Sequence, residues 1–235
     1  AAINGMMQYT GDDYTIYLNE DATDSLNEKL EGTYEGIGIR IGLNDNNDIY
    51  VYDVFDDSPA KIAGIQVGDI LISINGEDLY GKSTESASKI IQDSTQTKFT
   101  IVAKRNEENL TFVVERKTLI VPAISSSIKE VNGKKIGYIY LETFSSTIDT
   151  QVESTLLSME SEGIDSLIID VRYNTGGYLT SCTNIIELFL EKDKLMYTIK
   201  SKKDSVDYKD TTDTKREYPI VVLINGSSAS ASEIL

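Results

Sequence analysis

The sequence predicts an α+β protein in two parts, a small closed β-domain followed by an α/β layer. Between residues 34 and 117, short strands follow one another with only two brief helices, a pattern typical of a small closed β-domain. After residue 117, strands and helices alternate, which predicts helices packed against a sheet. The chain has 235 residues, 40% of them hydrophobic, which is enough for two modest domains with cores of their own.

The elements of the first part can be justified in order. Residues 1–33 are polar and read as helical, and Gly32 is a suitable helix end. YEGIGIRIGL alternates apolar and small residues like a strand, and NDIYVYDVF is a second strand after a turn. SPAKIAGI is a short helix that begins with a serine cap and a proline. The strand VGDILISING, the helix STESASKIIQ and the hairpin KFTIVAKR–NLTFVVERK complete this part.

The second part begins with the strand KKIGYIYLETF. STIDTQVESTLLSMESEG is an amphipathic helix, with Ile148, Val152, Leu156 and Met159 at a spacing of three to four residues. SLIIDVR is nearly all apolar, as expected of a strand buried on both faces. YNTGGYLTSCTNIIELFL predicts a turn into a helix, and KLMYTIKSK and YPIVVLIN are further strands. The boundary lies near Pro122, so the expected segments are 1–33, 34–117 and 118–235.

Composition excludes several kinds of function. The formal net charge is −16, from 22 basic and 38 acidic residues, which argues against nucleic acid or an anionic membrane as a partner. No stretch approaches the roughly 20 apolar residues of a membrane span. The opening AAINGMMQYTGDDY reads as the middle of a longer sequence, so we expect that a targeting segment could precede it.

The chain contains no histidine, and Cys182 is its single cysteine. Ser-His-Asp and Cys-His catalysis are therefore excluded, and we expect neither a bound metal nor a cofactor. Cys182 lies in a predicted helix and is expected to be a small buried hydrophobic residue. A serine nucleophile here would need another base, and lysine can serve if its surroundings lower its pKa toward neutrality.

The string GIGI at residues 36–39 predicts a binding site. Its two glycines allow successive backbone N–H groups to converge on a carboxylate. An open strand edge beside such a nest can accept an extended peptide, and the helix at 84–92 would form the other wall. The candidate peptide-binding residues are Gly36, Ile37, Gly38, Ile39, Ala87 and Ile91. An ordinary glycine-containing strand is the alternative interpretation of this string.

DVRYNTGG, residues 170–177, predicts an anion site. An apolar strand that ends in paired glycines brings backbone N–H groups to the carboxyl edge of a sheet, where α/β folds bind ligands. Gly176 and Gly177 are therefore candidates for an oxyanion hole, which needs rigid donors aimed at a developing negative charge. A plain strand-to-helix turn is the alternative.

YPIVVLINGSSASASEIL, residues 218–235, predicts a buried strand, a turn and the start of a helix. A serine at such a corner can present its hydroxyl to a cleft, and the N–H that follows it is a free first-turn donor. The alternative is a disordered Ser/Ala tail, against which the buried strand argues. The string is not G-x-S-x-G, since Ala231 and Ser232 follow Ser230.

Taken together, these motifs resemble the carboxy-terminal processing, or tail-specific, serine protease family. Residues 34–117 are similar to a PDZ domain in the circularly permuted bacterial form, with SPAKIAGIQVGDILISING as the most specific run. DDYTIYL and GTYEGIGI also match the family, and SASASEI is its most specific motif. The resemblance covers nearly the whole chain and implies a PDZ domain followed by a protease core of the crotonase or Clp-protease type.

The resemblance implies roles for several residues. Ser230 would be the nucleophile, and the oxyanion hole would use the N–H of Ala231 and that of Gly176 or Gly177, between which the sequence does not choose. Thr175 stands where the family commonly has proline. The general base would be a lysine in an F-G-K-G element, supported by a glutamine, and both are expected beyond residue 235. Residues 1–235 alone are therefore expected to be inactive.

The resemblance also implies partners and a location. The PDZ domain would capture the C-terminus of a protein substrate, and Arg105 would link that domain to the core, unless it is a solvated hairpin charge. A homodimer of the full-length protein and a place in the cell envelope of a bacterium are expected. A PDZ-containing peptide-binding scaffold without activity is the alternative function. An acyl hydrolase of small esters is a third, but it would not explain a peptide-capturing domain.

Overall fold

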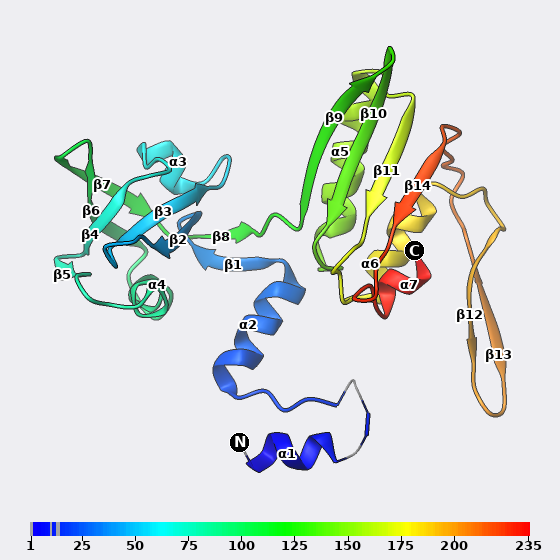
Figure 1. Cartoon of the computed structure of the whole chain (residues 1–235), viewed down its shortest axis with the longest axis horizontal. Coiled ribbons are helices and arrows are strands. Elements are labelled where there is room, and N and C mark those ends of the chain that lie inside the picture. The colour runs from blue at the N-terminus through cyan, green and yellow to red at the C-terminus, as the bar shows by residue number, and fades with distance from the viewer. Residues whose placement is uncertain (1, 10, 13–14) are drawn as a thin grey trace. The chain divides into compact units, whose positions relative to one another are not determined.

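A computed structural model describes residues 2–9, 11–12 and 15–235. The chain divides into two compact units, the first formed by residues 1–32 together with Pro122–Leu235 and the second by Thr33–Val121 (Figure 1). The second unit therefore retains residues 118–121, which the sequence analysis assigned to the part that follows.

The second unit is a β-domain with two helices. Its main sheet has the order β2-β3-β4-β6-β7, and the short β5 pairs with β4. A separate antiparallel ladder joins the two ends of the unit, β1 (Thr33–Gly36) and β8 (Lys117–Ile120). The other elements are β2 (Ile39–Leu43), β3 (Ile49–Val54), α3 (Pro59–Ala63), β4 (Ile70–Ile74), β5 (Glu77–Asp78), α4 (Thr84–Gln92), β6 (Lys98–Arg105) and β7 (Glu108–Glu115).

The strand predicted for YEGIGIRIGL is broken into β1 and β2. Gly38 has φ of 86°, a left-handed conformation that glycine adopts most readily. A Cβ at Gly38 would also lie 2.2 Å from the Cβ of Ser58, the residue that caps α3. The prediction of one continuous strand was therefore wrong, because the period-two pattern does not reveal a turn made by glycine.

The first unit has a four-stranded sheet in the order β14-β11-β10-β9. Strands β10, β11 and β14 are parallel neighbours, and β9 is antiparallel to β10. The strands are β9 (Ile124–Val131), β10 (Lys134–Leu141), β11 (Ser166–Asp170) and β14 (Ile220–Leu223), and the helices are α1 (Ala2–Gln8), α2 (Glu20–Glu31), α5 (Ile148–Ser161), α6 (Leu179–Glu187) and α7 (Ala231–Ile234).

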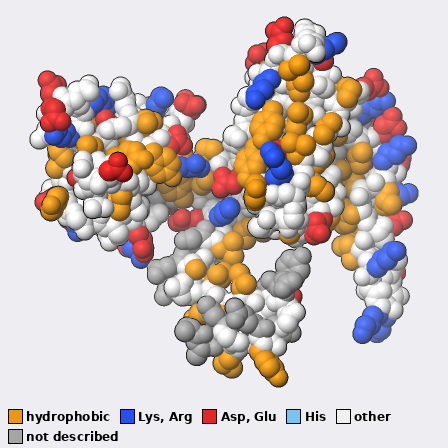
Figure 2. Space-filling model, viewed as in Figure 1, with side chains coloured by type: hydrophobic (Ala, Val, Ile, Leu, Met, Phe, Trp, Pro, Cys, Tyr) orange, Lys and Arg blue, Asp and Glu red, His pale blue; other side chains and the backbone are white. Residues whose placement is uncertain are grey.

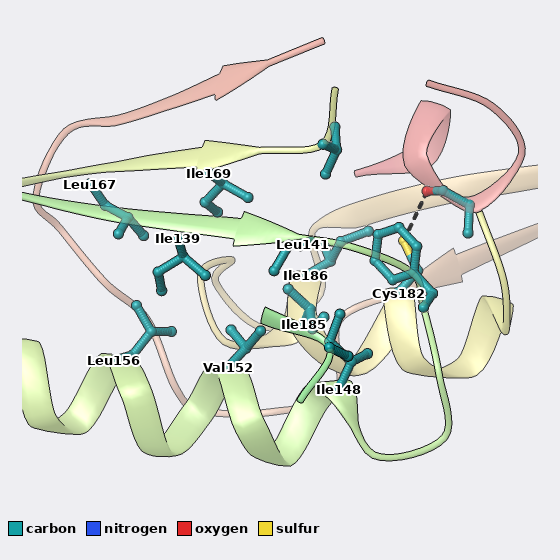
Figure 3. Packing of buried hydrophobic residues seen from close by; sticks show 14 of the residues in the cluster. Ile139, Leu141, Ile148, Val152, Leu156, Leu167, Ile169, Cys182, Ile185 and Ile186 are labelled. Atoms are coloured by element: carbon teal, nitrogen blue, oxygen red, sulfur yellow. Dashed lines mark hydrogen bonds between the residues drawn. The ribbon is translucent and has the colours of Figure 1, made fainter. Parts of the chain in front are cut away.

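The core of the first unit lies between this sheet and α5 and α6 (Figure 3). The four apolar residues predicted for one face of α5 are at most 4% exposed, which confirms the helical pattern. Cys182 of α6 is fully buried in the same core, as predicted. This packing fixes the carboxyl ends of β10, β11 and β14, where the loops begin that matter for function.

One expectation for the first unit needs correction, one lies partly outside the described residues, and one strand was not expected. Residues 1–33 are not one helix, since α1 and α2 are separated. The DDYTIYL match lies partly outside the described residues. β9 was not predicted, because its run ISSSIKEV carries three serines and two charges that hide its alternation. Where the chain is described, no helix is both long and apolar enough to cross a bilayer.

A two-stranded hairpin, β12 (Leu195–Lys200) with β13 (Ser205–Lys209), extends from the first unit. Tyr197 and Tyr208 stack across it with ring centroids 4.7 Å apart. Lys200 at the end of β12 and Lys202 and Lys203 in the loop that follows are exposed. Figure 2 shows basic side chains gathered over the hairpin. The sequence analysis missed β13 because of this polar loop.

Candidate active site

Two turns of the first unit meet beyond the carboxyl ends of β11 and β14. The glycine turn, residues 171–178, follows β11, and the serine turn, residues 224–230, follows β14. They touch, since a Cβ placed on Gly176 would lie 2.8 Å from the Cβ of Ser230 and 3.0 Å from the carbonyl oxygen of Ala229. The parallel pairing of β11 with β14 thus brings together Ser230 and the paired glycines, more than 50 residues apart in sequence.

The three alternate serines of SASAS have different surroundings. The hydroxyl of Ser228 donates to the carbonyl oxygen of Val171 at 2.8 Å, and that of Ser232 donates to the carbonyl oxygen of Asn174 at 2.8 Å. Ser230 is exposed, and among the described residues its hydroxyl donates to no acceptor. Ser230 is therefore the serine of this run whose hydroxyl is available for chemistry.

Ser230 occupies a conformation that is unusual for a residue with a side chain. Its φ is 55° and its ψ is −119°, immediately before the first residue of α7. Such a backbone costs about 1–3 kcal/mol and persists only where the surroundings impose it. One restraint is a hydrogen bond of 2.7 Å from the Ser230 N–H to Oε2 of Glu233. Ala231 then begins the helix, with its N–H in the first turn and without an intrahelical acceptor.

The two glycines differ in what their N–H groups do. The Gly176 N–H donates to Oδ1 of Asn174 at 2.8 Å, so it is already engaged. The Gly176 carbonyl oxygen accepts the Phe144 N–H at 3.0 Å. Because a trans peptide is planar, the Gly177 N–H points the opposite way, away from Phe144. That N–H has no acceptor among the described residues, which distinguishes the glycines that the sequence could not.

A buried carboxylate lies under the glycine turn. Asp170, 1% exposed, pairs with Arg172 at 2.6 Å and accepts the hydroxyl of Tyr138 at 2.7 Å. The hydrogen bonds from Arg172 lower the pKa of Asp170 to about 2. The Asp170 carboxylate is therefore ionised at neutral pH. We assign it a structural role, and it is not a candidate for proton transfer.

Other ionisable groups near the serine turn do not contact Ser230. Burial raises the pKa of the Cys182 thiol to about 12, and its Sγ lies 3.2 Å from the carbonyl oxygen of Ala231, an interaction drawn in Figure 3. The lysine contacts in the described part of the chain do not involve Ser230: Lys134 binds Asp165 and Lys135 binds the carbonyl oxygen of Glu162. The described residues also contain no group of three His, Cys, Asp or Glu side chains that could hold a metal ion.

The second unit carries a separate groove between β2 and α4. β2 is an edge strand of the main sheet, so one side of its backbone is open. Beside it lies an apolar cavity of about 60 Å³. All the predicted peptide-binding residues except Gly38 line this cavity, together with Tyr34, Glu35, Ile41, Leu71, Ile74, Ser88, Gln92 and Ile101. Gly38 forms the adjoining left-handed turn.

Arg105 lies within the second unit in a pair that the sequence analysis did not foresee. Its guanidinium donates to both carboxylate oxygens of Asp69, at 2.6 and 2.7 Å, and to the carbonyl oxygen of Gly64 at 2.8 Å. Asp69 is 1% exposed. The alternative interpretation, a solvated hairpin charge, is therefore wrong, and the expected link to the core stays a prediction.

Comparison with protein families agrees with both units. Residues 135–235 match the model of peptidase family S41, and residues 50–105 match that of the PDZ domain. The matches to peptidase family S41 and to the PDZ domain confirm the two domains that the resemblance implied and the α+β multidomain fold.

Particular relatives are similar over the whole chain. The carboxy-terminal processing protease CtpB of Bacillus subtilis (strain 168) is 34% identical over 237 residues, which cover 100% of this chain and 49% of that protein. A probable CtpA-like serine protease of Staphylococcus aureus (strain N315) is 28% identical and covers 100% of this chain and 47% of its own length. The chain therefore spans about half the length of the curated relatives it matches.

A solved structure supports the fold. The putative S41 protease from Bacteroides fragilis NCTC 9343 aligns over 100% of this chain and 74% of its own, with a TM-score of 0.52 and 16% identity.

Sequence reasoning named Ser230, Ala231 and both glycines but missed the residues that hold them. Asn174 and Phe144 are fully buried and make the backbone contacts of the glycine turn. Asn174 lies within the motif DVRYNTGG, so the sequence contained a residue that could have been named as a support of the glycine turn. Phe144 gave none, since a phenylalanine at the end of a strand is ordinary core.

Proposed function

We propose that residues 1–235 carry the nucleophile, the oxyanion hole and the peptide-capturing groove of a serine endopeptidase of the carboxy-terminal processing type. The availability of the Ser230 hydroxyl beside the unpaired Gly177 N–H is the observation that carries this proposal. The S41 and PDZ matches support the same reaction class, peptide-bond hydrolysis.

In the proposed reaction, a neutral lysine takes the proton of the Ser230 hydroxyl as the oxygen attacks the scissile carbonyl carbon. The carbonyl oxygen becomes an oxyanion, which the N–H groups of Ala231 and Gly177 bind. As this intermediate collapses, the protonated lysine gives its proton to the leaving nitrogen, so the amine product departs and an acyl group stays on Ser230, which water then releases as a carboxylic acid. We assign the second N–H to Gly177 rather than Gly176, because that of Gly176 is bound to Asn174.

The general base is proposed to be a lysine outside residues 1–235. No lysine contact in the described part of the chain involves Ser230, and the exposed lysines of the β12–β13 loop lie in a polar turn. A positioned base contributes about 10²–10⁴ in rate. Residues 1–235 by themselves should therefore not turn over a peptide that the protein with its base cleaves.

The groove of the second unit is proposed to bind the C-terminus of a protein substrate. The open edge of β2 can add an extended strand, and the Ile37 and Gly38 N–H groups donate to no protein acceptor in the described chain, so they can face a carboxylate. The apolar cavity would take the side chain of the last residue. By analogy with bacterial relatives, we place the protein outside the cytoplasm.

The test is a fluorophosphonate serine probe, applied to the protein expressed with any sequence its gene encodes after Leu235. Mass spectrometry should locate the adduct on Ser230, and Ser230→Ala should abolish labelling. Ser228→Ala is the matched control: it removes a neighbouring hydroxyl that binds Val171 and should keep the label. An adduct on another residue would contradict the assignment of the nucleophile.

A second candidate function is a peptide-binding scaffold without protease activity. It is favoured by the absence of any lysine contact to Ser230 in the described chain. A folded protein that binds C-terminal peptides, yet takes no label on Ser230 in the experiment above, would support it.

A further inference from the structure

We propose that Asn174 is a positioning residue that fixes the two donors of the oxyanion hole relative to each other. This inference rests on the proposed function and adds a residue to which the reaction scheme gives no role. Asn174 has no exposed surface, and its side chain reaches neither Ser230 nor the space where a substrate would lie. Any effect on chemistry must therefore act through the groups it holds.

The side chain of Asn174 holds the glycine turn. Its Nδ2 donates to the carbonyl oxygen of Leu141, the last residue of β10, at 3.1 Å. Its Oδ1 accepts the Gly176 N–H at 2.8 Å. One amide thus ties the turn to the sheet and occupies the N–H that would otherwise compete with the neighbouring donor of Gly177.

The backbone of the same residue holds the serine turn. The Asn174 carbonyl oxygen accepts the Ala229 N–H at 3.2 Å and the Ser232 hydroxyl at 2.8 Å. These two groups flank Ser230 and Ala231, the nucleophile and the first donor. Asn174 is therefore in contact with both sides of the hole, and every polar group it carries has a protein partner.

Only an amide fits this position. The side chain must donate to one backbone group and accept from another, and aspartate cannot donate when ionised whereas leucine can do neither. Asn174→Leu keeps the number of side-chain heavy atoms and the branch at Cγ, but the Leu141 carbonyl and the Gly176 N–H lose their partner. The Gly176 N–H is then free to turn, and Gly177 with it.

The experiment measures the rate of fluorophosphonate labelling of Ser230 in the protein that carries its base. Because the phosphoryl oxygen of the probe occupies the oxyanion hole, Asn174→Leu should label about 10²-fold more slowly, the loss that accompanies removal of one such donor. The amide proton of Gly177, followed by NMR in ¹⁵N-glycine-labelled protein, should move downfield on labelling in the wild type and less in the variant.

A matched control separates positioning from stability. Gln151→Leu on α5 also removes an amide that accepts a backbone N–H, that of Ala123 at 2.9 Å, but it contacts neither turn. It should lower the melting temperature and leave the labelling rate unchanged. The inference would be overturned if Asn174→Leu were labelled as fast as the wild type. It would also be overturned if Gln151→Leu, at an equal loss of melting temperature, were slowed as much as Asn174→Leu.

If Asn174→Leu does not fold, Ser232→Ala tests the same claim more gently. It removes one bond to the Asn174 carbonyl and should slow labelling about 5-fold, the factor of one neutral hydrogen bond. An unchanged rate in Ser232→Ala would overturn the inference in that case. A wild-type protein that takes no label on Ser230 would instead overturn the proposed function, and this inference with it.

Discussion

The three serines of SASAS differ in the hydrogen bonds that their hydroxyl groups make, and these depend on which backbone groups lie nearby. Ser228 and Ser232 donate to backbone carbonyls of the glycine turn, while Ser230 has a positive φ and its hydroxyl donates to no acceptor among the described residues. A sequence shows three equivalent serines, so only the family resemblance could select the middle one. The structure supplies a physical reason: Ser228 and Ser232, which flank Ser230, both donate to the glycine turn, and Ser230 does not.

Cys182 gives a prediction at the same scale. Its thiol is fully buried, and burial raises its pKa to about 12. Since the thiolate is the reactive form, native protein should react with iodoacetamide far more slowly than protein in 8 M urea, by about 10²-fold or more. Mass spectrometry of the two samples measures this ratio. Rapid modification of the native protein would show that the core around α6 opens.

The proposed oxyanion donors show a limit of prediction from the sequence. Paired glycines at a strand end predicted the site, but two adjacent N–H groups look identical in a sequence. The choice depends on the side chain of Asn174 and on a bridge from Gly177 to Phe144, both of which come from the packing of β10 against β11. Tertiary contacts of this kind leave no periodic signal.

At the scale of elements, helices were easier to predict than strands. The apolar face of α5 and the caps of α3 were visible in the sequence, because spacing and capping residues are local. β9 is an edge strand with serines and charges on both faces, and the break between β1 and β2 depends on the backbone of Gly38. Both features are set by neighbours distant in the sequence.

The groove between β2 and α4 yields an element-scale prediction. Ala87 is fully buried and lines a cavity of about 60 Å³, so the larger side chain of Ala87→Leu should fill it. Peptides with an apolar last residue should then bind at least about 10-fold more weakly, since a buried apolar side chain contributes about 1.5–3 kcal/mol. Isothermal titration calorimetry measures this loss of affinity with a peptide that has a free C-terminal carboxylate. The same peptide with an amidated C-terminus shows how much of the affinity depends on the carboxylate.

Glu85→Leu is the control for that experiment. Glu85 lies on the exposed side of the same helix and forms a surface ion pair with Lys89, which contributes little to stability. Its substitution should leave peptide affinity unchanged. Equal binding by Ala87→Leu and the wild type would place the peptide elsewhere.

At the scale of the whole molecule, the two units have separate cores, and this predicts two separable unfolding transitions. Arg105→Leu strands the buried Asp69 without its partner and should destabilise the second unit alone, by about 3 kcal/mol. Hydrogen exchange read by mass spectrometry in increasing urea distinguishes the units. A single shift shared by both units would contradict their independence.

The stability of the first unit should depend on pH, and the same hydrogen-exchange experiment can measure this. The pKa of Asp170 is lowered from 3.8 to about 2 by Arg172, so its contribution is complete above pH 5 and is lost as pH falls from 4 to 2. The contribution is about 1–2 kcal/mol, reduced from the full shift because Arg172 is half exposed. The transition of the first unit in Asp170→Asn should lack this part of the acid sensitivity, and an unchanged acid profile would contradict it.

The ladder between β1 and β8 has a consequence for how such chains can change. Thr33 faces Ile120 across it, so the second unit leaves and rejoins the chain at one point, although its ends are 88 residues apart in number. A segment inserted in this way is exchangeable: it can be lengthened, replaced or removed by recombination at a single place without reordering the strands around it. The two units can therefore differ in ancestry, and the groove of the second unit can change in sequence while the serine and glycine turns of the first unit stay as they are.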